Sequence, residues 1–570
     1  MMKMKRTEYS SKQFFYAKRC FFLFFFLIIS ANAFSQSISL NDRFSQEYVR
    51  RKQLEDSSFY ASTSFCIGNH NYSMFTDSVL NLSSLQNRFI KSISTSFNKK
   101  NNSFFWLPVS VAQQYNSHHA YGWNDGAMIP SHGYQVFMSA GIYFQSGHFS
   151  VQLQPEFVYT PNNPFETFHS EYNDGIWYNY YQLLNRIDMP EQFGNKSYYK
   201  ILPGQSSIRY NTKSVSFGIS TENLYWGPGI RNSLVMSNNA PGFLHATINT
   251  IKPIKTSIGS FELQIIAGKL NESGIALSDT NRYYNNVRLY QPKINQWRYL
   301  TGLALTWQPK WTKGLFLGMT KASYQYHTDI SGIADILPLQ GIIKSNSESQ
   351  GKKASLGSIF MRYVFPEENA ELYAEYGRND KWANIVNLVA DKNYPRGYIV
   401  GIRKLSNLFQ NKSRIEFAAE ITQLELPTIS LINQSKSWYL NDYVRQGYTN
   451  YGQVMGAGIG PGGNSQTIDI SWVKGFSKVG LLFERVVHNN DFYYAAFGPL
   501  GDYARHWIDL STTLHADWRY KRFTFSSELS LIRSLNYEWW RIDIPSTPNY
   551  FADEYDVLNF HGKLSFSYRL

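Results

Sequence analysis

A two-residue hydrophobic period, recurring from about residue 134 to the C-terminus, limits the fold of this chain more than any other feature. In several segments apolar side chains alternate with Ser, Thr, Gln, Asp or Glu. Examples span residues 148–157, 215–219, 261–268, 415–422, 467–472, 508–517 and 523–531. Such alternation is typical of a β-strand whose two faces meet different environments. The segments therefore predict an all-β chain with many two-faced strands.

Soluble sandwiches or propellers and transmembrane barrels both contain many such strands, and three features favour the barrel. Many segments are about ten residues long, which is the length a tilted strand needs to cross the hydrocarbon. No Gly/aromatic motif recurs at the fixed period of a propeller. Aromatic residues gather at the ends of segments, as an interfacial girdle requires. They are Tyr143, Phe144, Phe157, Tyr159, Tyr299, Trp307, Tyr363, Phe365, Trp518 and Tyr520.

The last segment is also an amphipathic strand, and the chain ends on it. One face comprises Phe560, Gly562, Leu564, Phe566, Tyr568 and Leu570. This ending resembles the C-terminal recognition signal of outer-membrane barrels, with Leu where an aromatic residue is usual. The alternative is an ordinary edge strand.

Composition agrees with a barrel and excludes other classes. Aromatic residues make up 17% of the 570 residues, too many for a disordered chain. A mean hydropathy of -0.36 is too polar for a helical transporter, but a barrel buries half of each strand in a polar interior. Length alone suggests three or four domains, although one large barrel also accounts for it. At about 25 residues per strand and connection, the chain predicts 16 to 18 antiparallel strands.

The N-terminus has the pattern of a secretory signal peptide over residues 1–33. A basic stretch precedes an apolar run, CFFLFFFLII at residues 20–29, and Ala31-Asn32-Ala33 is a small-residue cleavage signature. We expect cleavage after Ala33, with Ser35 as the second choice. The segment carries six bases and one acid, so its removal lowers the formal net charge from +13 to +8. One cysteine, Cys66, then remains, and an internal disulfide is excluded.

Residues 34–105 differ from the rest and predict a short, partly helical periplasmic lead-in before a barrel over 106–570. Residues 41–49 open with helix-capping residues and continue with charged helix formers. Residues 77–93 place apolar side chains at nearly helical spacing.

Local motifs for catalysis or metal binding are missing, which predicts a protein that is not an enzyme and has no cofactor or metal. His118-His119 is an isolated pair that is poorly placed to share a metal. Residues 458–463 satisfy G-x-G-x-x-G, but a strand pattern follows where the dinucleotide fingerprint requires a helix. We therefore interpret this stretch as a loop between strands.

The most unusual local chemistry lies in residues 221–242, TENLYWGPGIRNSLVMSNNAPG. The stretch combines amides, an arginine and an indole, which are the groups that recognise sugars. They are Asn223, Trp226, Arg231, Asn232, Asn238 and Asn239. Turn signals accompany them at Gly227, Pro228, Gly229, Pro241 and Gly242. The alternative is a structural turn that folds into the lumen and uses its amides on its own backbone.

Residues 216–270, with the ENLYWGPG turn and the RNSLVMSNNAPGF segment, resemble the Wzi capsule-assembly family of Gram-negative outer membranes. Residues 452–494 also look similar, with a GIGPGGNS turn that contains Gly460, Pro461 and Gly462, and with Arg485 and His488 farther along. The resemblance implies an eighteen-stranded outer-membrane barrel with a periplasmic helical segment and loops that occlude the lumen. It also implies a non-catalytic surface lectin that helps to organise or retain capsular polysaccharide.

Three functions follow as hypotheses. The first is an outer-membrane protein that binds capsular or exopolysaccharide through loop aromatics and a set of polar residues and aids capsule assembly or retention. That set is Asn223, Trp226, Arg231, Asn232, Asn238, Asn239, Arg485 and His488. The second is a diffusion porin for small solutes, and the third is an outer-membrane enzyme whose catalytic groups no local motif reveals. For the first we expect a monomer that contacts outer-membrane lipid, lipopolysaccharide and surface polysaccharide, but no nucleic acid.

Overall fold

The computed structural model describes residues 43–55, 102–277, 279–336, 351–379, 395–408, 413–426, 437–501, 506–540 and 555–569. The expected signal peptide, the helical pattern at 77–93 and Leu570 lie outside these residues. Helix α2 (Arg43–Glu55) confirms the helix expected near residue 41. None of the helices within the described ranges is long and apolar enough to cross a membrane.

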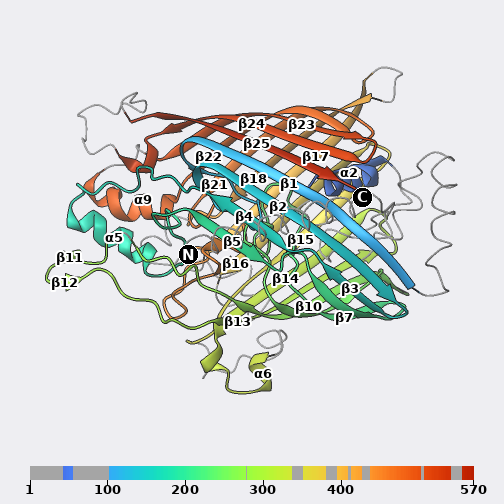
Figure 1. Cartoon of the computed structure of the whole chain (residues 1–570), viewed down its shortest axis with the longest axis horizontal. Helices are drawn as coiled ribbons and strands as arrows, with labels where there is room; N and C mark the ends of the chain where they lie inside the picture. Colours follow the sequence, from blue (N-terminus) through green and yellow to red (C-terminus); the bar gives the residue numbers. More distant parts are fainter. Residues whose placement is uncertain are drawn as a thin grey trace, which may run out of the picture.

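Most of the described strands form one closed antiparallel β-barrel of eighteen strands (Figure 1). Two separate two-stranded sheets lie outside the barrel wall, β11 (Tyr283–Tyr284) with β12 (Val287–Arg288) and β19 (Thr449–Asn450) with β20 (Gln453–Val454). Three of the eighteen strands are interrupted, and each of these consists of two segments. The pairs of segments are β3 and β4, β5 and β6, and β8 and β9. The bounds of the barrel strands are β1 (Asn102–Tyr121), β2 (Ser131–Ser146), β3 (Phe149–Leu153), β4 (Glu156–Thr160), β5 (Tyr198–Leu202), β6 (Ser207–Asn211), β7 (Val215–Ser220), β8 (His245–Thr250), β9 (Ile254–Thr256), β10 (Gly259–Leu270), β13 (Arg298–Pro309), β14 (Leu315–Tyr326), β15 (Ala354–Phe365), β16 (Ala370–Asn379), β17 (Arg396–Leu408), β18 (Ser413–Gln423), β21 (Asn464–Lys474), β22 (Ser477–Val487), β23 (Ile508–Tyr520), β24 (Phe523–Leu535) and β25 (Val557–Tyr568).

The barrel closes because the last strand pairs with the first. β25 runs antiparallel to β1, with Val109 opposite Tyr568 and Asn116 opposite His561. The alternating segment at the C-terminus is thus the closing strand of the barrel rather than an open edge. The expected strand at 148–157 is divided into β3 and β4 at Pro155, whose backbone has no N–H to donate to a neighbouring strand.

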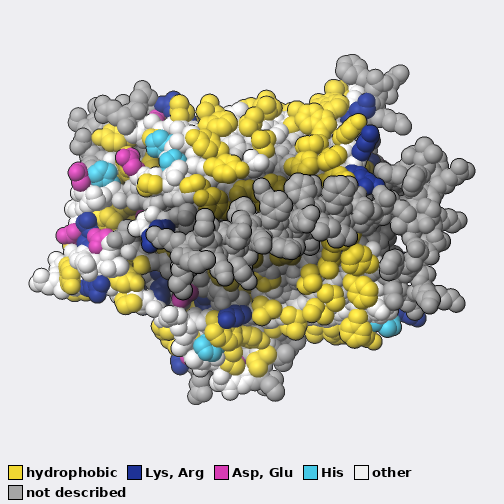
Figure 2. Space-filling model, viewed as in Figure 1, with side chains coloured by type: hydrophobic (Ala, Val, Ile, Leu, Met, Phe, Trp, Pro, Cys, Tyr) yellow, Lys and Arg dark blue, Asp and Glu magenta, His cyan; other side chains and the backbone are white. Residues whose placement is uncertain are grey.

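Strand faces are inverted relative to a soluble protein. On β18 the apolar side chains of Phe417 and Ile421 are exposed, whereas the carboxylates of Glu416 and Glu420 are buried inside the barrel. Figure 2 shows hydrophobic side chains over the barrel wall, with charged side chains gathered toward its two ends. An apolar outside and a polar inside are what a bilayer-spanning barrel requires.

The two ends of the barrel differ in their connections. At one end, the short-turn end, neighbouring strands are joined by tight turns such as residues 475–476 and 521–522. At the other, the long-loop end, the connections are long and carry α5 (Asp174–Leu184), α9 (Asn490–Phe497) and the 3-10 helix η4 (Tyr537–Trp539) (Figure 1).

Helix α2 enters the lumen at the short-turn end and is held there by charged bonds. Arg50 Nε lies 2.7 Å from Glu371 Oε1, and Glu371 Oε2 lies 2.5 Å from a guanidinium nitrogen of Arg362. On the other side of the helix, Glu47 Oε2 lies 2.6 Å from Arg403 NH2. Because these groups project from strands and helix into a shared interior, they fix α2 to the barrel wall.

Replacing Glu371 with Ala should destabilise the barrel strongly. The change leaves two buried guanidiniums, Arg50 and Arg362, without their carboxylate, which typically costs about 3–5 kcal/mol. Urea unfolding in detergent micelles measures the change. Glu368→Ala is the matched control, because Glu368 pairs with Lys404 at 3.3 Å on the exposed surface nearby, and such pairs contribute about 0.2–1 kcal/mol. Equal losses in the two variants would contradict this account of α2.

Candidate functional site

The loop between β7 and β8, residues 221–244, turns inward and fills part of the lumen. Trp226 is fully buried, and its Nε1 donates to Gln264 Oε1 of β10 at 2.9 Å. Its ring packs on Gly302, where a Cβ would lie only 2.5 Å from the ring. Gly227 has a φ of 119°, a conformation that requires glycine at this turn. The expected turn signals thus serve to fold the chain back into the barrel.

Two glutamates on the barrel wall hold the tip of this loop. The carboxylate of Glu420 accepts from the backbone N–H groups of residues 230, 231 and 232, at 2.5, 3.2 and 3.0 Å. Glu484 accepts a bidentate pair from Arg231, at 3.1 and 2.6 Å. Such charge-assisted bonds are stronger than neutral ones. The guanidinium proposed for sugar recognition is therefore already paired with a carboxylate.

The amides of this loop also bond within the protein. Asn223 Nδ2 donates to Asn238 Oδ1 at 2.7 Å, and Asn238 Nδ2 donates to the carbonyl of Asn124 at 3.1 Å. Asn232 Nδ2 donates to Thr422 Oγ1 at 3.2 Å, and Asn239 Nδ2 donates to the carbonyl of Val454 at 2.9 Å. Asn223, Asn232 and Asn239 are buried. Amides that bond within the protein are typical of a structural turn folded into the lumen, which is the alternative interpretation of residues 221–242.

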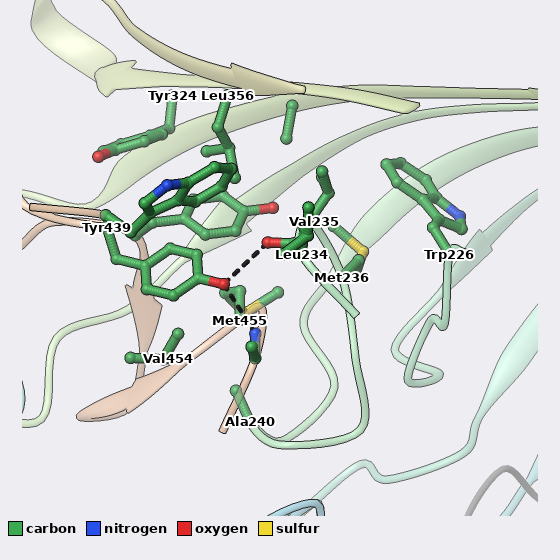
Figure 3. Packing of buried hydrophobic residues seen from close by; sticks show 14 of the residues in the cluster. Trp226, Leu234, Val235, Met236, Ala240, Tyr324, Leu356, Tyr439, Val454 and Met455 are labelled. Atoms are coloured by element: carbon green, nitrogen blue, oxygen red, sulfur yellow. Dashed lines mark hydrogen bonds between the residues drawn. The ribbon is translucent and has the colours of Figure 1, made fainter. Parts of the chain in front are cut away.

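A second inward loop, within residues 437–463, packs on the first. Figure 3 shows Tyr439 among buried residues of both loops, including Leu234, Met236 and Met455. The Tyr439 hydroxyl donates to the carbonyl of Leu234 at 2.9 Å and accepts from the backbone N–H of Ala457 at 2.8 Å. The two loops thus form one hydrophobic core within the lumen. Gly229, Pro228, Pro241 and Gly242 lie in the first loop, and Gly460, Pro461 and Gly462 in the second.

Residues 458–463 lead directly into β21, which confirms a loop between strands rather than a dinucleotide site. Gly460 and Gly462 both have positive φ, at 76° and 61°. Among the described residues, no group of three or more His, Cys, Asp or Glu is placed to hold a metal ion. In the His118-His119 pair the two Nδ1 atoms lie 3.3 Å apart.

Arg485 and His488 point to opposite sides of the wall and do not join the residues of the 221–242 loop in one site. Arg485 shares the outward face of β22 with Leu481 and Phe483. Its NH1 group donates a hydrogen bond to Gln466 Oε1 at 2.8 Å. His488 lies on the inward side, where its Nε2 is 2.8 Å from Asp509 Oδ2 and its ring stacks on Trp507.

A cavity of about 230 Å³ remains in the lumen, between Glu47 of α2 and Arg231 of the first inward loop. Its carboxylates outnumber its fixed cations. The carboxylates are Glu47, Asp125, Glu416, Glu420, Asp469, Asp517 and Glu528, and the cations are Arg231, Arg403, Lys478 and Lys563. Several of them are ion-paired, such as Glu416 with Arg403 and Lys478 and Asp125 with Lys563, so the cavity is lined by charges of both signs.

The long-loop end has a layer of aromatic residues above the lumen. α5, α9 and η4 contribute Tyr180, Phe492 and Trp539 to one buried cluster, in which Phe168 stacks on Tyr180 with ring centroids 4.0 Å apart. Local sequence patterns did not reveal this layer, because its members come from three connections that are distant in the chain. It packs these three connections against one another.

Asp491 ties three parts of the long-loop end together. Its carboxylate accepts from the backbone N–H of Leu426 at 2.8 Å and from the hydroxyl of Ser437 at 2.5 Å. Burial raises the pKa of Asp491 to about 7, although these two hydrogen bonds act to lower it. The carboxyl group is thus buried where its ionised form is disfavoured.

The family model described as "Capsule assembly protein Wzi" matches residues 113–546 of the chain. The structure of Wzi from Escherichia coli, an outer membrane protein involved in group 1 capsule assembly and a carbohydrate-binding β-barrel, is similar in fold. It is 10% identical, with a TM-score of 0.54 over 92% of this chain and 98% of that chain. OprB from Pseudomonas putida is 11% identical, with a TM-score of 0.34 over 84% and 97%, too low to support an argument. No curated protein sequence matches the chain.

The buried Asp491 carboxyl predicts loops that are less stable at higher pH. The pKa of Asp491 in the folded protein, about 7, exceeds the value near 3.9 expected when unfolded. The folded state therefore binds more protons between these values, and the free energy of unfolding falls as pH rises from about 4 to 7. Asp491→Asn should flatten this dependence. Proteolysis of the loops in detergent across pH 5–8 measures it, and an unchanged slope in the variant would contradict the assignment.

Proposed function

The chain belongs to the capsule assembly protein Wzi family, and we propose from this premise that it binds surface polysaccharide and helps to assemble or retain a capsule. The protein lies in the outer membrane, which its closed barrel spans. Its action is non-catalytic, and binding takes place at the long-loop end. The glycan is a capsular or exopolysaccharide.

The filled lumen is the observation that supports this proposal over passage of solutes. A porin requires an open, water-filled lumen. Here the two inward loops form a hydrophobic core inside the lumen, and α2 occupies the short-turn end. A polysaccharide arriving from outside therefore meets the loop surface, and the loops that fill the barrel also support that surface.

The direction of the barrel follows from its connections. In outer-membrane barrels short turns face the periplasm and longer loops face the exterior. We assign the long-loop end, with α5, α9 and η4, to the cell surface, and α2 to the periplasmic side. Residues 1–33 act as a signal peptide in this proposal, and the barrel works as a monomer surrounded by lipid and lipopolysaccharide.

Of the sequence-based candidates, those that are buried serve the proposed site indirectly. Trp226, Asn223, Asn232 and Asn239 hold the plug on which the outer loops rest. Arg485 lies on the outer wall beside lipid-facing residues, where a guanidinium suits the phosphate groups of lipopolysaccharide. Exposed residues of the loops at the long-loop end contact the polysaccharide directly.

Deleting the gene should release surface polysaccharide from the cells into the medium, because retention depends on a protein that binds the glycan at the surface. Quantifying cell-bound and released polysaccharide measures this, with a strain complemented by the wild-type gene as control. The purified barrel should also bind polysaccharide released from the same cells. Normal retention in the deletion strain, together with no binding by the purified barrel, would overturn the proposal.

A further inference from the structure

A small exposed hairpin projects at the long-loop end beside α5 (Figure 1). It consists of β11 (Tyr283–Tyr284) and β12 (Val287–Arg288), joined by Asn285 and Asn286. Both asparagines have positive φ, at 49° and 61°, as a type I′ turn requires. Residues 283–288 are all exposed. A tight turn of this type gives the exposed side chains defined directions.

The pairing of the hairpin places one ring and one guanidinium on the same face. Tyr283 is directly opposite Arg288, and Tyr284 is opposite Val287. Side chains of directly opposite residues share a face, with Cβ atoms about 4.5–5.5 Å apart. The Tyr290 ring adds to the first face, because the Arg288 guanidinium lies 5.6 Å from its centroid. Tyr283 is 54% exposed, so its ring is available to a ligand.

The hairpin is anchored to the aromatic layer by its flanking residues. Arg282 lies over the Trp177 ring of α5 at 4.3 Å and pairs with Asp174 at 3.2 Å. Leu289 is buried in the same cluster as Trp177, and its carbonyl accepts from Asn185 Nδ2 at 2.8 Å. Because both ends are fixed, a ligand would not have to order the hairpin on binding, which favours affinity.

The two arginines of this region differ in their charge partners. Arg282 faces two carboxylates, those of Asp174 and Asp279. Within the part of the chain that the structure describes, Arg288 bonds instead to uncharged oxygens, the Thr280 carbonyl at 2.7 Å and Asn281 Oδ1 at 3.4 Å. Its positive charge is thus exposed beside two tyrosine rings, and no carboxylate among the described residues pairs with it.

We propose that Tyr283, Arg288 and Tyr290 form a binding strip for an acidic polysaccharide. The tyrosine rings stack on the apolar faces of pyranose units, and the Arg288 guanidinium pairs with the carboxylate of a uronic acid unit, a geometry that suits its planar fork. This assignment rests on the function proposed above. It specifies the surface that binds the polysaccharide and the class of glycan that is bound.

The test uses two probes that differ only in charge. One is surface polysaccharide released from the cells that carry this protein, and the other is the same material after its carboxyl groups are reduced to alcohols. Binding of each probe to the purified barrel in detergent is compared for wild type, Tyr283→Ala, Arg288→Gln and a control, Tyr520→Ala. Tyr520 is a matched control, because it is an exposed tyrosine beside Lys521 at the short-turn end.

Arg288→Gln should weaken binding of the native polysaccharide about tenfold, the loss expected for one charge-assisted hydrogen bond. It should leave binding of the carboxyl-reduced probe at the wild-type level. Tyr283→Ala should weaken binding of both probes severalfold, and Tyr520→Ala should change neither. Exposed hairpin residues carry little of the fold, and unchanged unfolding in urea verifies this for each variant.

Three results would contradict the proposal, and they are distinguishable. If wild type binds the native polysaccharide and both hairpin variants bind it equally well, the strip is wrong while the proposed function stands. If wild type binds neither probe, the strip is wrong, and normal retention of polysaccharide in the deletion strain would then overturn the proposed function as well. Equal binding of the two probes by wild type would overturn the acidic preference.

Discussion

The structure depends on one requirement, that every backbone N–H and C=O group in the hydrocarbon must be paired within the protein. An open sheet leaves two unpaired edges, so the strands have to close. The register between β1 and β25 provides this closure. Closure in turn fixes which residues face lipid and which face the interior, because the side chains of each strand alternate. The exposed Phe417 and the buried Glu416 of β18 are one consequence.

A barrel of eighteen strands is too wide for strand side chains alone to fill its interior. This chain fills it with its own loops. Hydrogen bonds from side chains of the barrel wall offset the cost of burying the polar groups of these loops. Glu420 binds three consecutive N–H groups of the first inward loop, and Glu484 binds Arg231. The interior is thus used as a core that supports the outer loops, and recognition is left to surfaces such as the hairpin of Tyr283 and Arg288.

Much of the fold could be predicted from the sequence, because strand alternation depends only on neighbouring residues. The site could not, because burial of Trp226 and Asn232 depends on partners such as Gln264 and Thr422 from distant strands. Some signals were nevertheless present. Arg485 is separated by an even number of residues from the apolar Leu481 and Phe483, a spacing that predicts the outer wall for it, although we named it as a candidate for polysaccharide binding. The Asn285-Asn286 pair between Tyr-Tyr and Val-Arg is a hairpin signal, and it identifies the exposed strip.

The interior of this barrel is a packed support and not a passage. Conductance of the purified protein in planar lipid bilayers distinguishes the two, with a general diffusion porin in the same bilayers as the positive control. The intact barrel should give no steady conductance steps across a range of voltages. Large, stable, ohmic channels would contradict it, because ions would then cross the region that the two inward loops and α2 occupy.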